Sequence, residues 1–517
     1  MNKAQSALAS RELFDVVIIG SGPAASLFAA RSAAADRSVL MLEAGPERRL
    51  EQLYSSQMWA RQLKWGGTAV EEQGNHKIGQ AFNSGWGSGG GGLHHYAVYP
   101  RLHPSDFSVA TDHGHGLDWP ISYSQLQPHY DRVQTEIGLS GDASQEHWRP
   151  AGADYPMPPL PLFAQSRIIA RGFAQQGLAT APIPLAINSR PYNGRPACQY
   201  DGWCDAGCPT GALANPLVTY LASALAAGAQ LRCDSTVTQL HHAANRLSGV
   251  SYIDPHGQLR TVVADQVVLA AGTVENSRLL LANQLANSSG NVGRYLMSHP
   301  ARSIYALFEE ATEPTLGVTG GQLISHDRYH PKRKAPDQYG SYQWLIGNAM
   351  KPNDLLGMAN TRPDINGAAL HDFMQRAAHH MGNMVFVAED IAQRENRIEL
   401  TPQLDRNGTP TARAIHNITA QTQAVTEAAT AEGLAIMRAA GAKQAWHGPL
   451  IGMHIMGGTA MGKDPQQAVA NPSGRSWEVD NLWLAGASLF PSSGAVNPTF
   501  TLLALADRGA DALLGQP

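Results

Sequence analysis

The hydrophobic pattern at the N-terminal end of the chain predicts a strand, a tight turn, a helix and a second strand. Residues 16–19 are a β-branched run, Gly20, Gly22 and Ala25 follow it, and an alanine-rich stretch comes next. A second apolar run, SVLML, ends at Glu43, about 20 residues after the glycines. Short continuous apolar runs beside turn signals are typical of strands buried in a parallel sheet. We therefore predict an α/β fold that begins with a strand–helix–strand unit.

The C-terminal end carries a second strand–loop–helix pattern. Residues 482–485 form an apolar run, a loop with glycine and serine follows, and a helical pattern begins near Pro498. The apolar positions of that pattern are Leu502, Leu505, Ala506 and Leu513. Proline suits the first helical position and asparagine is a good N-cap, so we predict a helix that opens at Pro498 with Asn497 as its cap. The body of this helix belongs to the core, and only its N-terminus is available for chemistry.

The region between these ends is long enough for further domains. With 517 residues the chain exceeds a typical single-core domain, so at least two domains are expected. Residues 301–444 alternate apolar runs such as MVFVAE with long polar loops, which favours a sheet. The proline-rich residues 155–163 predict an extended connector.

The composition narrows the classes of function. The net charge of −4 gives no basic surface for nucleic acid, and four cysteines in 517 residues are too few for a disulfide-dense secreted domain. No apolar run approaches the roughly 18 residues of a membrane helix. The opening residues, MNKAQSALASRELFDVV, lack the apolar core and the twin arginine of an export signal. By its own sequence we therefore expect a cytoplasmic chain with no direct membrane span.

The N-terminal glycine turn points to a dinucleotide. Gly20 permits the tight turn, Gly22 lets the backbone approach a pyrophosphate, and the helix that begins at Pro23 and Ala24 receives the phosphate charge. Glu43, at the end of the second strand, is placed to accept the ribose hydroxyls. The order of strand, turn, helix and acidic strand end predicts a Rossmann-like dinucleotide-binding domain. This fingerprint alone leaves NAD and FAD open.

Two C-terminal segments help to distinguish between NAD and FAD as the cofactor. The segment HIMGGTAMG (454–462) joins a histidine to a glycine turn that can approach a planar ring. The N-terminus of the helix predicted at Pro498 would favour the negative charge that develops on a reduced isoalloxazine. Both features favour FAD.

Several segments together give the chain a family resemblance. Between the N-terminal fingerprint and the two C-terminal segments, three more occur in order: RLHPSDF (101–107), VVLAAGTVENSRLLL (267–281) and NVGRYLMSHP (291–300). In this order the chain resembles the glucose-methanol-choline (GMC) oxidoreductases, a family of FAD-dependent alcohol and sugar oxidoreductases, over nearly its whole length. Its motifs are most similar to those of bacterial sugar and polyol dehydrogenases and of pyranose 2-oxidase, because the second active-site position is Asn497 rather than a histidine.

The resemblance implies a discontinuous architecture of α/β (α+β) class. Residues 12–110, 196–300 and 445–517 are expected to form the Rossmann-like FAD-binding domain. Residues 111–195 and 301–444 are expected to form an interleaved, sheet-based substrate domain with its connectors.

The resemblance also implies roles for individual residues. His454 is the expected catalytic base, which takes the hydroxyl proton as hydride leaves the carbinol carbon, and Asn497 is expected to hold the same oxygen. The residues expected to contact FAD are Gly20, Gly22, Pro23, Ala24, Glu43, Gly90, Gly91, His94, His95, Ala271, Gly272, Gly486, Ala487, Asn497, Pro498 and Thr499. His95 occupies the position at which pyranose 2-oxidase carries a covalent flavin, although dissociable FAD is favoured here. His103 and His299 are expected to be structural.

Three of the four cysteines lie in one segment, CQYDGWCDAGCP (198–209). Their spacing is Cys198-x5-Cys204-x3-Cys208, and three thiolates from one short loop can hold a [3Fe–4S] iron–sulfur centre. The segment resembles the three-iron loops of several membrane-linked sugar dehydrogenases of the family, whereas other members keep a similar loop without a cluster. A packed loop is the equal alternative, and a Cys204–Cys208 disulfide is disfavoured in a reducing compartment. Cys233 is expected to be a core residue.

The expected function is FAD-dependent oxidation of a hydroxyl group of a sugar, glycoside or polyol by hydride transfer to flavin N5. The electrons are expected to pass to a quinone, a cytochrome or a partner subunit. A pyranose-oxidase-like or other alcohol oxidase and a non-catalytic electron-transfer flavoprotein are the alternatives, and the presence of both His454 and Asn497 argues against the second. Export to the periplasm would depend on a small partner that carries the signal.

Overall fold

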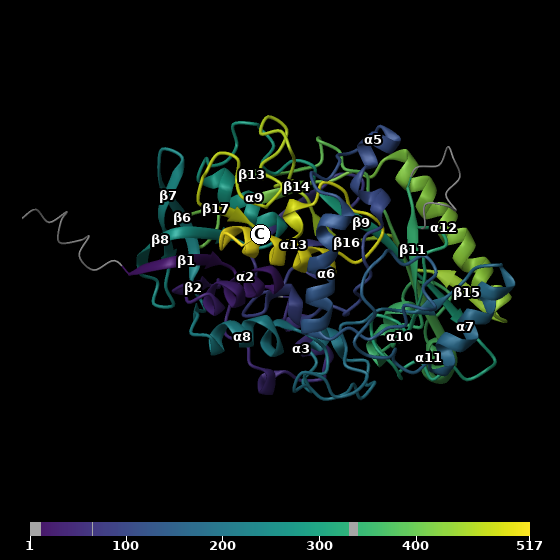
Figure 1. The fold of residues 1–517 in the computed structure, drawn as a ribbon. Helices are drawn as coiled ribbons and strands as arrows, with labels where there is room; N and C mark the ends of the chain where they lie inside the picture. The colour runs from purple at the N-terminus through teal and green to yellow at the C-terminus, as the bar shows by residue number, and fades with distance from the viewer. Residues whose placement is uncertain (1–11, 65, 330–339, 517) are drawn as a thin grey trace, which may run out of the picture.

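Figure 1 shows the fold as a computed structural model that describes residues 12–64, 66–329 and 340–516. Two large sheets lie at opposite sides of this view. The N-terminal strands are on the left, and the long helix α12 (Ala420–Ala439) lies along the right edge. The two sheets give the chain the mixed α/β architecture that the sequence predicts.

The N-terminal unit is the predicted strand, turn, helix and strand. It consists of β1 (Leu13–Ile19), α2 (Pro23–Ala34) and β2 (Val39–Leu42). The turn after β1 requires glycine, because Gly20 has a φ of +103° and a Cβ there would lie 2.6 Å from the carbonyl oxygen of Ala270. The local prediction is confirmed in this unit.

The first sheet is parallel at its centre. In spatial order its strands are β5 (Gln230–Arg232), β2, β1, β8 (Leu259–Leu269), β7 (Arg246–Ile253) and β6 (Thr236–Ala243), with β17 (Leu482–Leu484) beside β8. β1 pairs in parallel with both β2 and β8, and β17 runs parallel to β8. β6 and β7 extend the sheet as antiparallel strands. This order is consistent with the Rossmann-like fold.

The second sheet is antiparallel and forms the other side of the molecule. Its strands in order are β15 (Gln444–His447), β9 (Met297–Leu307), β12 (Met381–Ala388), β11 (Tyr342–Ile346), β10 (Leu323–Ser325) and β4 (Ala181–Pro182), with β16 (Ile451–Met456) also beside β9. The apolar run MVFVAE lies in β12 as predicted, apart from its last residue. β16 carries the candidate base His454, so this residue belongs to the second sheet rather than the first. The proposed domain boundaries themselves remain a prediction.

Helices cover both sheets and complete two hydrophobic cores. α2, α6 (Tyr123–Ile137), α8 (Tyr220–Ala226) and α13 (Thr499–Leu513) pack together beside the first sheet, with their apolar residues in the largest core. α7 (Ala164–Gln175) and α12 pack on the second sheet, where Trp344 and Phe386 are buried. Residues 155–163 form no helix or strand, as predicted for a connector.

The remaining elements lie between and around these layers. A small sheet contains β13 (Arg397–Leu404), β14 (Pro410–Ile415) and β3 (Val70–Gln73). The other helices are α3 (Gln57–Gln62), α4 (Gln80–Asn83), α5 (Val109–His113), α9 (Thr273–Ala282), α10 (Pro352–Ala359) and α11 (Ala368–His380). α9 follows β8, as the pattern of residues 267–281 suggests.

The start of the C-terminal helix differs from the prediction. α13 begins at Thr499, Pro498 is its N-cap residue, and no side chain caps it. The Asn497 amide is used elsewhere, because its oxygen and its nitrogen contact Gln343 and His454. The predicted cap was therefore wrong for a tertiary reason.

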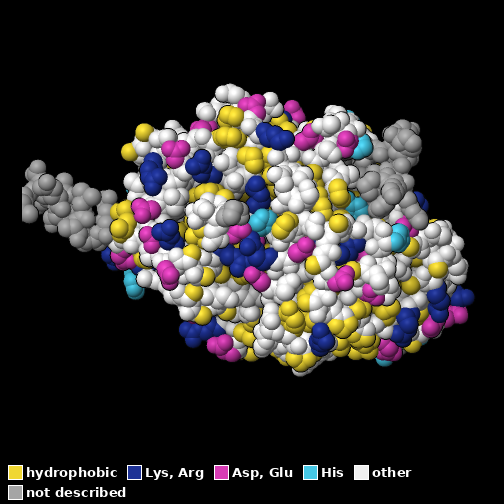
Figure 2. All heavy atoms as spheres, in the orientation of Figure 1, with side chains coloured by type: hydrophobic (Ala, Val, Ile, Leu, Met, Phe, Trp, Pro, Cys, Tyr) yellow, Lys and Arg dark blue, Asp and Glu magenta, His cyan; other side chains and the backbone are white. Residues whose placement is uncertain are grey.

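The surface carries mixed charge. In Figure 2, basic and acidic side chains alternate over the face shown, which agrees with the small net charge of −4. Among the residues that the structure describes, no helix combines the length and apolarity that crossing a membrane requires. Cys233, expected in the core, is only partly buried just after β5.

Candidate active site and cofactor cavity

A cavity of about 380 Å³ lies where the two sheets meet. The ends of β1, β2 and β8 contribute Gly20, Glu43 and Ala271, and β16 contributes His454. Ligands of doubly wound sheets bind at the carboxyl ends of the parallel strands. The cavity therefore occupies the position expected for a dinucleotide and extends to the candidate base.

Most residues predicted to contact the cofactor line this one cavity. They are Gly20, Gly22, Pro23, Ala24, Glu43, Gly90, Gly91, His94, His95, Ala271, Gly272, Ala487, Asn497, Pro498 and Thr499. Gly486 does not line the cavity; it precedes the lining residue Ala487. The structure thus gathers segments from both ends of the chain, while the individual cofactor contacts remain predictions.

The backbone walls of the cavity fit a bulky cofactor such as FAD. A Cβ at Gly22 or at Gly272 would meet no atom within 4 Å, and both glycines line the cavity. Gly90 approaches closely, since its Cβ would lie 3.1 Å from the Cα of Gly22. Small residues at these three positions keep the wall open for a group that lies against the backbone.

Glu43 holds the strand-end loops of the cavity together. One of its carboxylate oxygens accepts a hydrogen bond from Ser21 Oγ at 2.6 Å, and the other accepts from the backbone N–H of Gly45 at 2.9 Å. Burial raises the pKa of this carboxyl, whereas these hydrogen bonds favour its ionised form. Its predicted contact with ribose would add to the bonds that it makes within the chain.

Several groups of lining residues were not predicted from the sequence. They include residues 82–86, residues 96–98, residues 235–237 at the start of β6, and Thr68, Arg278, Asp405 and Thr409. Arg278 forms ion pairs with Glu275 and Asp405. No local motif marks these positions, because they reach the cavity only through strand pairing and loop packing.

His454 sits on a β-bulge. β16 pairs with β9 on both sides of His454, and the register shifts between Met453 and Ile455. His454 has a φ of +59°, and its backbone N–H donates to Oδ1 of Asn83 at 3.0 Å. Left-handed backbone is costly for a residue with a Cβ, and bulges next to active sites redirect side chains. The bulge directs the His454 ring to the cavity.

The predicted pair of His454 and Asn497 meets at the cavity wall. Nδ2 of Asn497 lies 3.1 Å from Nε2 of His454. Oδ1 of Asn497 accepts a hydrogen bond from Nε2 of Gln343 at 2.9 Å, which turns the amide nitrogen to His454. The two residues come from the second sheet and from the loop before α13, and their catalytic roles remain predictions.

His299 contacts His454 directly, which the sequence analysis missed. Nδ1 of His299 lies 3.0 Å from Nδ1 of His454. On its other side, Nε2 of His299 lies 3.0 Å from the carbonyl oxygen of Gly494 and 3.3 Å from that of Ser493. The expectation of a purely structural role was therefore incomplete. The segment SHP is the only local sequence signal at His299, and it does not indicate the contact with His454.

Burial favours the neutral form of both histidines. It lowers the pKa of His454 well below the usual value, and the neighbouring His299 lowers it further. Burial also lowers the pKa of His299. A neutral imidazole has one nitrogen with a lone pair, so His454 is in the form that can accept a proton.

In the cavity wall, His94 is buried and His95 is partly buried. Nε2 of His94 donates to the carbonyl oxygen of Ser84 at 3.0 Å, and burial lowers the pKa of His94 to about 3. Nδ1 of His95 accepts the N–H of Ala97 at 3.2 Å, and burial lowers its pKa to about 4. His103, expected to be structural, is buried against Tyr329.

The cysteine loop presents three free thiols. Each sulfur accepts a backbone N–H: Cys198 from Tyr200 at 3.3 Å, Cys204 from Thr319 at 3.5 Å and Cys208 from Leu213 at 3.4 Å. Burial raises the pKa of Cys198 to about 11, and the nearby Cys208 contributes. The three sulfurs do not converge as ligands of one ion. N–H bonds to sulfur suit cluster ligands, so the donor set is compatible with the predicted centre without establishing it.

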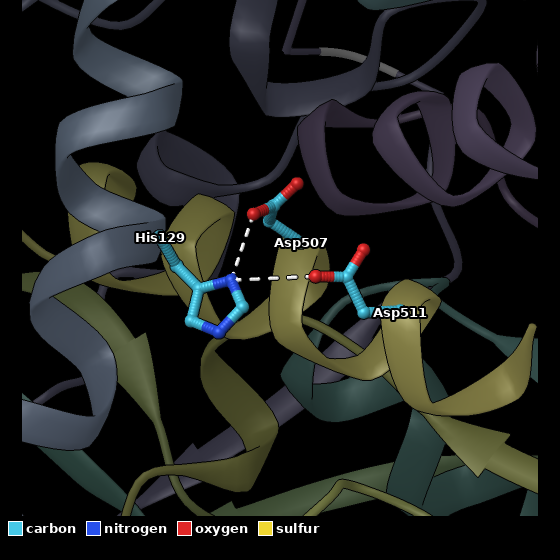
Figure 3. A group of neighbouring side chains, drawn as sticks. All are labelled: His129, Asp507 and Asp511. Carbon is cyan, nitrogen blue, oxygen red and sulfur yellow. Dashed lines mark hydrogen bonds and ion pairs between the residues drawn. The ribbon is translucent and has the colours of Figure 1, made fainter. Parts of the chain in front are cut away.

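Figure 3 shows the group in the described part of the chain whose ligand atoms do lie within one ion's reach: His129, Asp507 and Asp511. Nδ1 of His129 lies 2.8 Å from the carboxylate of Asp507. Arg132 pairs with both carboxylates, and Arg31 pairs with Asp507 at 2.7 Å. These guanidinium groups already balance the acidic charge, so we interpret the group as an ion-pair network that joins α6 to α13.

The sheet order, the glycine-walled cavity and the histidine–asparagine pair at its wall define the class of the protein as a dinucleotide-binding oxidoreductase. Family models described as GMC oxidoreductase match residues 66–301 and 392–506. The chain belongs to the GMC oxidoreductase family, which confirms the resemblance. Enzymes of this family bind FAD, which the cavity fits.

Characterised relatives and solved structures agree with this assignment. The fructose dehydrogenase large subunit of Gluconobacter japonicus is 30% identical, with 97% of each chain covered. The 2-methyl-1,2-propanediol dehydrogenase of Mycolicibacterium austroafricanum is 32% identical over 82% of this chain and 80% of its own. A formate oxidase from Aspergillus oryzae has the same fold, with a TM-score of 0.68, 14% identity and 98% of each chain covered. The chain is therefore similar to dehydrogenases that act on sugar and alcohol groups.

Proposed function

We propose that the protein oxidises a hydroxyl group of a sugar, glycoside or polyol with FAD and passes the electrons to a quinone, a cytochrome or a partner subunit. The family supplies the cofactor and the class of reaction. The names of two relatives, a fructose dehydrogenase and a propanediol dehydrogenase, support sugars and polyols as the substrate class.

His454 and Asn497 carry the chemistry on the protein side. When bound, FAD supplies the hydride acceptor, flavin N5. Nε2 of His454 takes the hydroxyl proton as the C–H bond breaks and the carbonyl forms, and Asn497 Nδ2 donates a hydrogen bond to the same oxygen. A positioned base contributes about 10²–10⁴-fold to such a step, and positioning of the reacting groups supplies much of the remainder.

One observation carries this proposal: Nε2 of the partly buried His454, whose pKa is lowered, lies 3.1 Å from the amide nitrogen of Asn497 at the cavity wall. A base and a hydrogen-bond donor at this spacing can bind one hydroxyl oxygen between them. An electron-transfer flavoprotein without alcohol chemistry has no use for such a pair.

Anaerobic reduction of the FAD-loaded protein tests the function. Sugars, glycosides and polyols are mixed in turn with the holoenzyme, and at least one should bleach the flavin absorbance. Reoxidation should then be fast with a quinone or a cytochrome c and slow with oxygen, whereas fast reaction with oxygen would favour the oxidase alternative. Flavin that dithionite reduces but no alcohol reduces would contradict the proposal.

We also propose that the cysteine loop provides the electron exit as a [3Fe–4S] centre held by Cys198, Cys204 and Cys208. Burial raises the pKa of Tyr96, a lining residue, and the nearby loop residues Asp205 and Cys204 contribute, so the loop lies near the cavity. Lys351 Nζ pairs with Asp205 of the loop at 3.1 Å, within a buried environment. A centre here would take electrons one at a time from the two-electron cofactor FAD and pass them to one-electron acceptors.

Metal analysis decides between this centre and a packed loop. Anaerobically purified protein should contain about three irons and about four sulfides per chain, as the [3Fe–4S] stoichiometry requires. Cys204→Ser should lose the iron and the paramagnetic resonance signal of the oxidised state, whereas Cys233→Ser, outside the loop, should keep both. Iron-free protein that turns over fully with its acceptor would make the loop a structural element.

The compartment and the partner belong to the same proposal. We propose that the chain stays in the cytoplasm unless a small signal-bearing subunit carries it to the periplasm. The name of one relative, a dehydrogenase large subunit, supports a partner of this kind. The test is to express the chain with and without a small signal-bearing subunit and to fractionate the cells. Activity should appear in the periplasm only when the subunit is present.

A further inference from the structure

A chain of hydrogen bonds runs through the candidate site from the second sheet. Gln343 on β11 donates to Asn497, whose nitrogen faces His454, and the other side of the His454 ring contacts His299 on β9. Oε1 of Gln343 in turn lies 3.1 Å from Nε2 of His326. Asparagine, glutamine and neutral histidine can each be inverted, so a chain of this kind has two opposite directions.

The contacts of His299 fix the direction in which the hydrogen bonds of this chain are donated. Nε2 of His299 faces the carbonyl oxygens of Gly494 and Ser493, at 3.0 and 3.3 Å, and carbonyl oxygens only accept hydrogen bonds. Nε2 of His299 therefore carries the hydrogen. Because the buried ring is neutral, its Nδ1 has the lone pair, and this nitrogen faces Nδ1 of His454.

The direction then passes through His454. Its Nδ1 must carry the hydrogen that is donated to His299, so its Nε2 has the lone pair. That lone pair accepts from Nδ2 of Asn497 at 3.1 Å, which is consistent with Oδ1 accepting from Gln343. The opposite direction would put the His299 lone pair against two carbonyl oxygens.

We propose that His299 and Gln343 are positioning residues that fix this direction, so that His454 presents an unprotonated Nε2 and Asn497 an amide N–H to the substrate oxygen. The inference rests on the proposed function and deepens it. Neither residue touches the reacting atoms: His299 selects the His454 tautomer, and Gln343 selects the face of the Asn497 amide. The base is thereby ready before substrate binds, and no proton has to be rearranged.

Two substitutions at Gln343 test its end of the chain. Gln343→Met keeps the approximate volume but removes the donor, so flavin reduction should slow by about fivefold, the equivalent of one hydrogen bond. Gln343→Glu should behave differently with pH. A protonated carboxyl can still donate to Asn497, whereas the ionised form only accepts and inverts the amide. Flavin reduction by Gln343→Glu should therefore fall as pH rises, with no such fall in Gln343→Met.

A purely structural role for Gln343 makes the opposite prediction. Both substitutions would then slow flavin reduction by similar factors and with the same pH profile, which would overturn the assignment. Both proteins are compared as FAD-loaded holoenzymes of equal flavin content, so that a slower rate cannot be caused by loss of FAD.

The His299 end is tested without turnover. Nitrogen-15 labelling of the histidines in the oxidised holoenzyme reports which ring nitrogen carries hydrogen, and His454→Gln identifies the signals of His454. The wild type should show His454 protonated at Nδ1. His299→Asn keeps an acceptor near the Nδ1 position and should retain this form, whereas His299→Leu should give a mixture of tautomers. His447→Gln, at an exposed histidine outside the cavity, is the control.

The outcomes separate this inference from the proposed function. A wild-type signal with hydrogen at Nε2 of His454 would overturn the inference, even if alcohols reduce the flavin. The expected tautomer together with flavin that no alcohol reduces would uphold the direction of the chain and contradict the function. Should His299→Leu fail to fold, the wild type and His299→Asn still decide the question.

Discussion

Asn83, at the end of α4, should control how well His454 is placed. Its Oδ1 accepts the backbone N–H of His454 at 3.0 Å, and its Nδ2 donates to the carbonyl of Gly452 at 3.2 Å. Both contacts hold the bulge of β16, on which His454 has a φ of +59°. We predict that Asn83→Ala slows flavin reduction by alcohol while FAD stays bound.

The size of the effect follows from two opposing quantities. A left-handed backbone costs a residue with a Cβ about 1–2 kcal/mol, and each neutral hydrogen bond contributes about 1 kcal/mol. Loss of both Asn83 contacts removes about 2 kcal/mol, which is comparable with the strain that they oppose. Since about 1.4 kcal/mol corresponds to tenfold in rate, flavin reduction should fall by about 10- to 30-fold.

Anaerobic stopped-flow absorbance measures this rate directly. Asn83→Asp keeps the acceptor for the His454 N–H but loses the donor, so its rate should be intermediate. Asn75→Ala is the matched control, because Asn75 donates to the carbonyl of Ile418 and does not line the cavity. Flavin reduction by Asn83→Ala at the wild-type rate would refute the idea that this side chain maintains the bulge.

Three further predictions concern the same cavity. His454→Ala should retain FAD but reduce it about 10²–10⁴-fold more slowly, and Asn497→Ala should show a smaller loss, as single-turnover rates would reveal. Only the neutral form of His454 accepts a proton, and its pKa is lowered. The wild-type rate of flavin reduction should therefore stay constant through neutral pH and fall only as the pH drops through that lowered pKa. A fall in rate near pH 7 would contradict this assignment. Gly20→Ala should lower the free energy of unfolding by about 2–5 kcal/mol in a denaturant titration and weaken FAD binding, because φ is +103° and the Cβ would lie 2.6 Å from the oxygen of Ala270; unchanged stability would contradict the close approach.

The nucleotide end of the cavity could be predicted because its signals are local. The apolar run of β1, the glycines of the turn and the helix that follows form a pattern that can be recognised within a few residues of one another. Glu43 ends β2 for the same reason, and it lines the cavity as expected. The segment around His454 was likewise recognised by the residues beside it, although its backbone conformation was not.

The Asn497 cap failed where local and tertiary partners compete. As an isolated pattern, asparagine before Pro498 is a good helix cap. In the folded protein its amide contacts Gln343, 154 residues earlier in the chain, and His454, 43 residues earlier. The Asn497 amide atoms that would cap the helix are engaged by Gln343 and His454 instead. A local sequence pattern does not indicate which distant strand will supply such a partner.

By itself, the sequence determined the family, the Rossmann-like unit and many of the residues that line the cavity, because turns and periodicity are set by neighbouring side chains. Only the tertiary structure decided the bulge under His454, its contact with His299 across 155 residues, and the direction of the hydrogen bonds between them. A hydrogen bond depends on the position of two atoms to within a few tenths of an ångström. Those positions follow from how β9, β11 and β16 pair and pack, which no segment of the chain specifies alone.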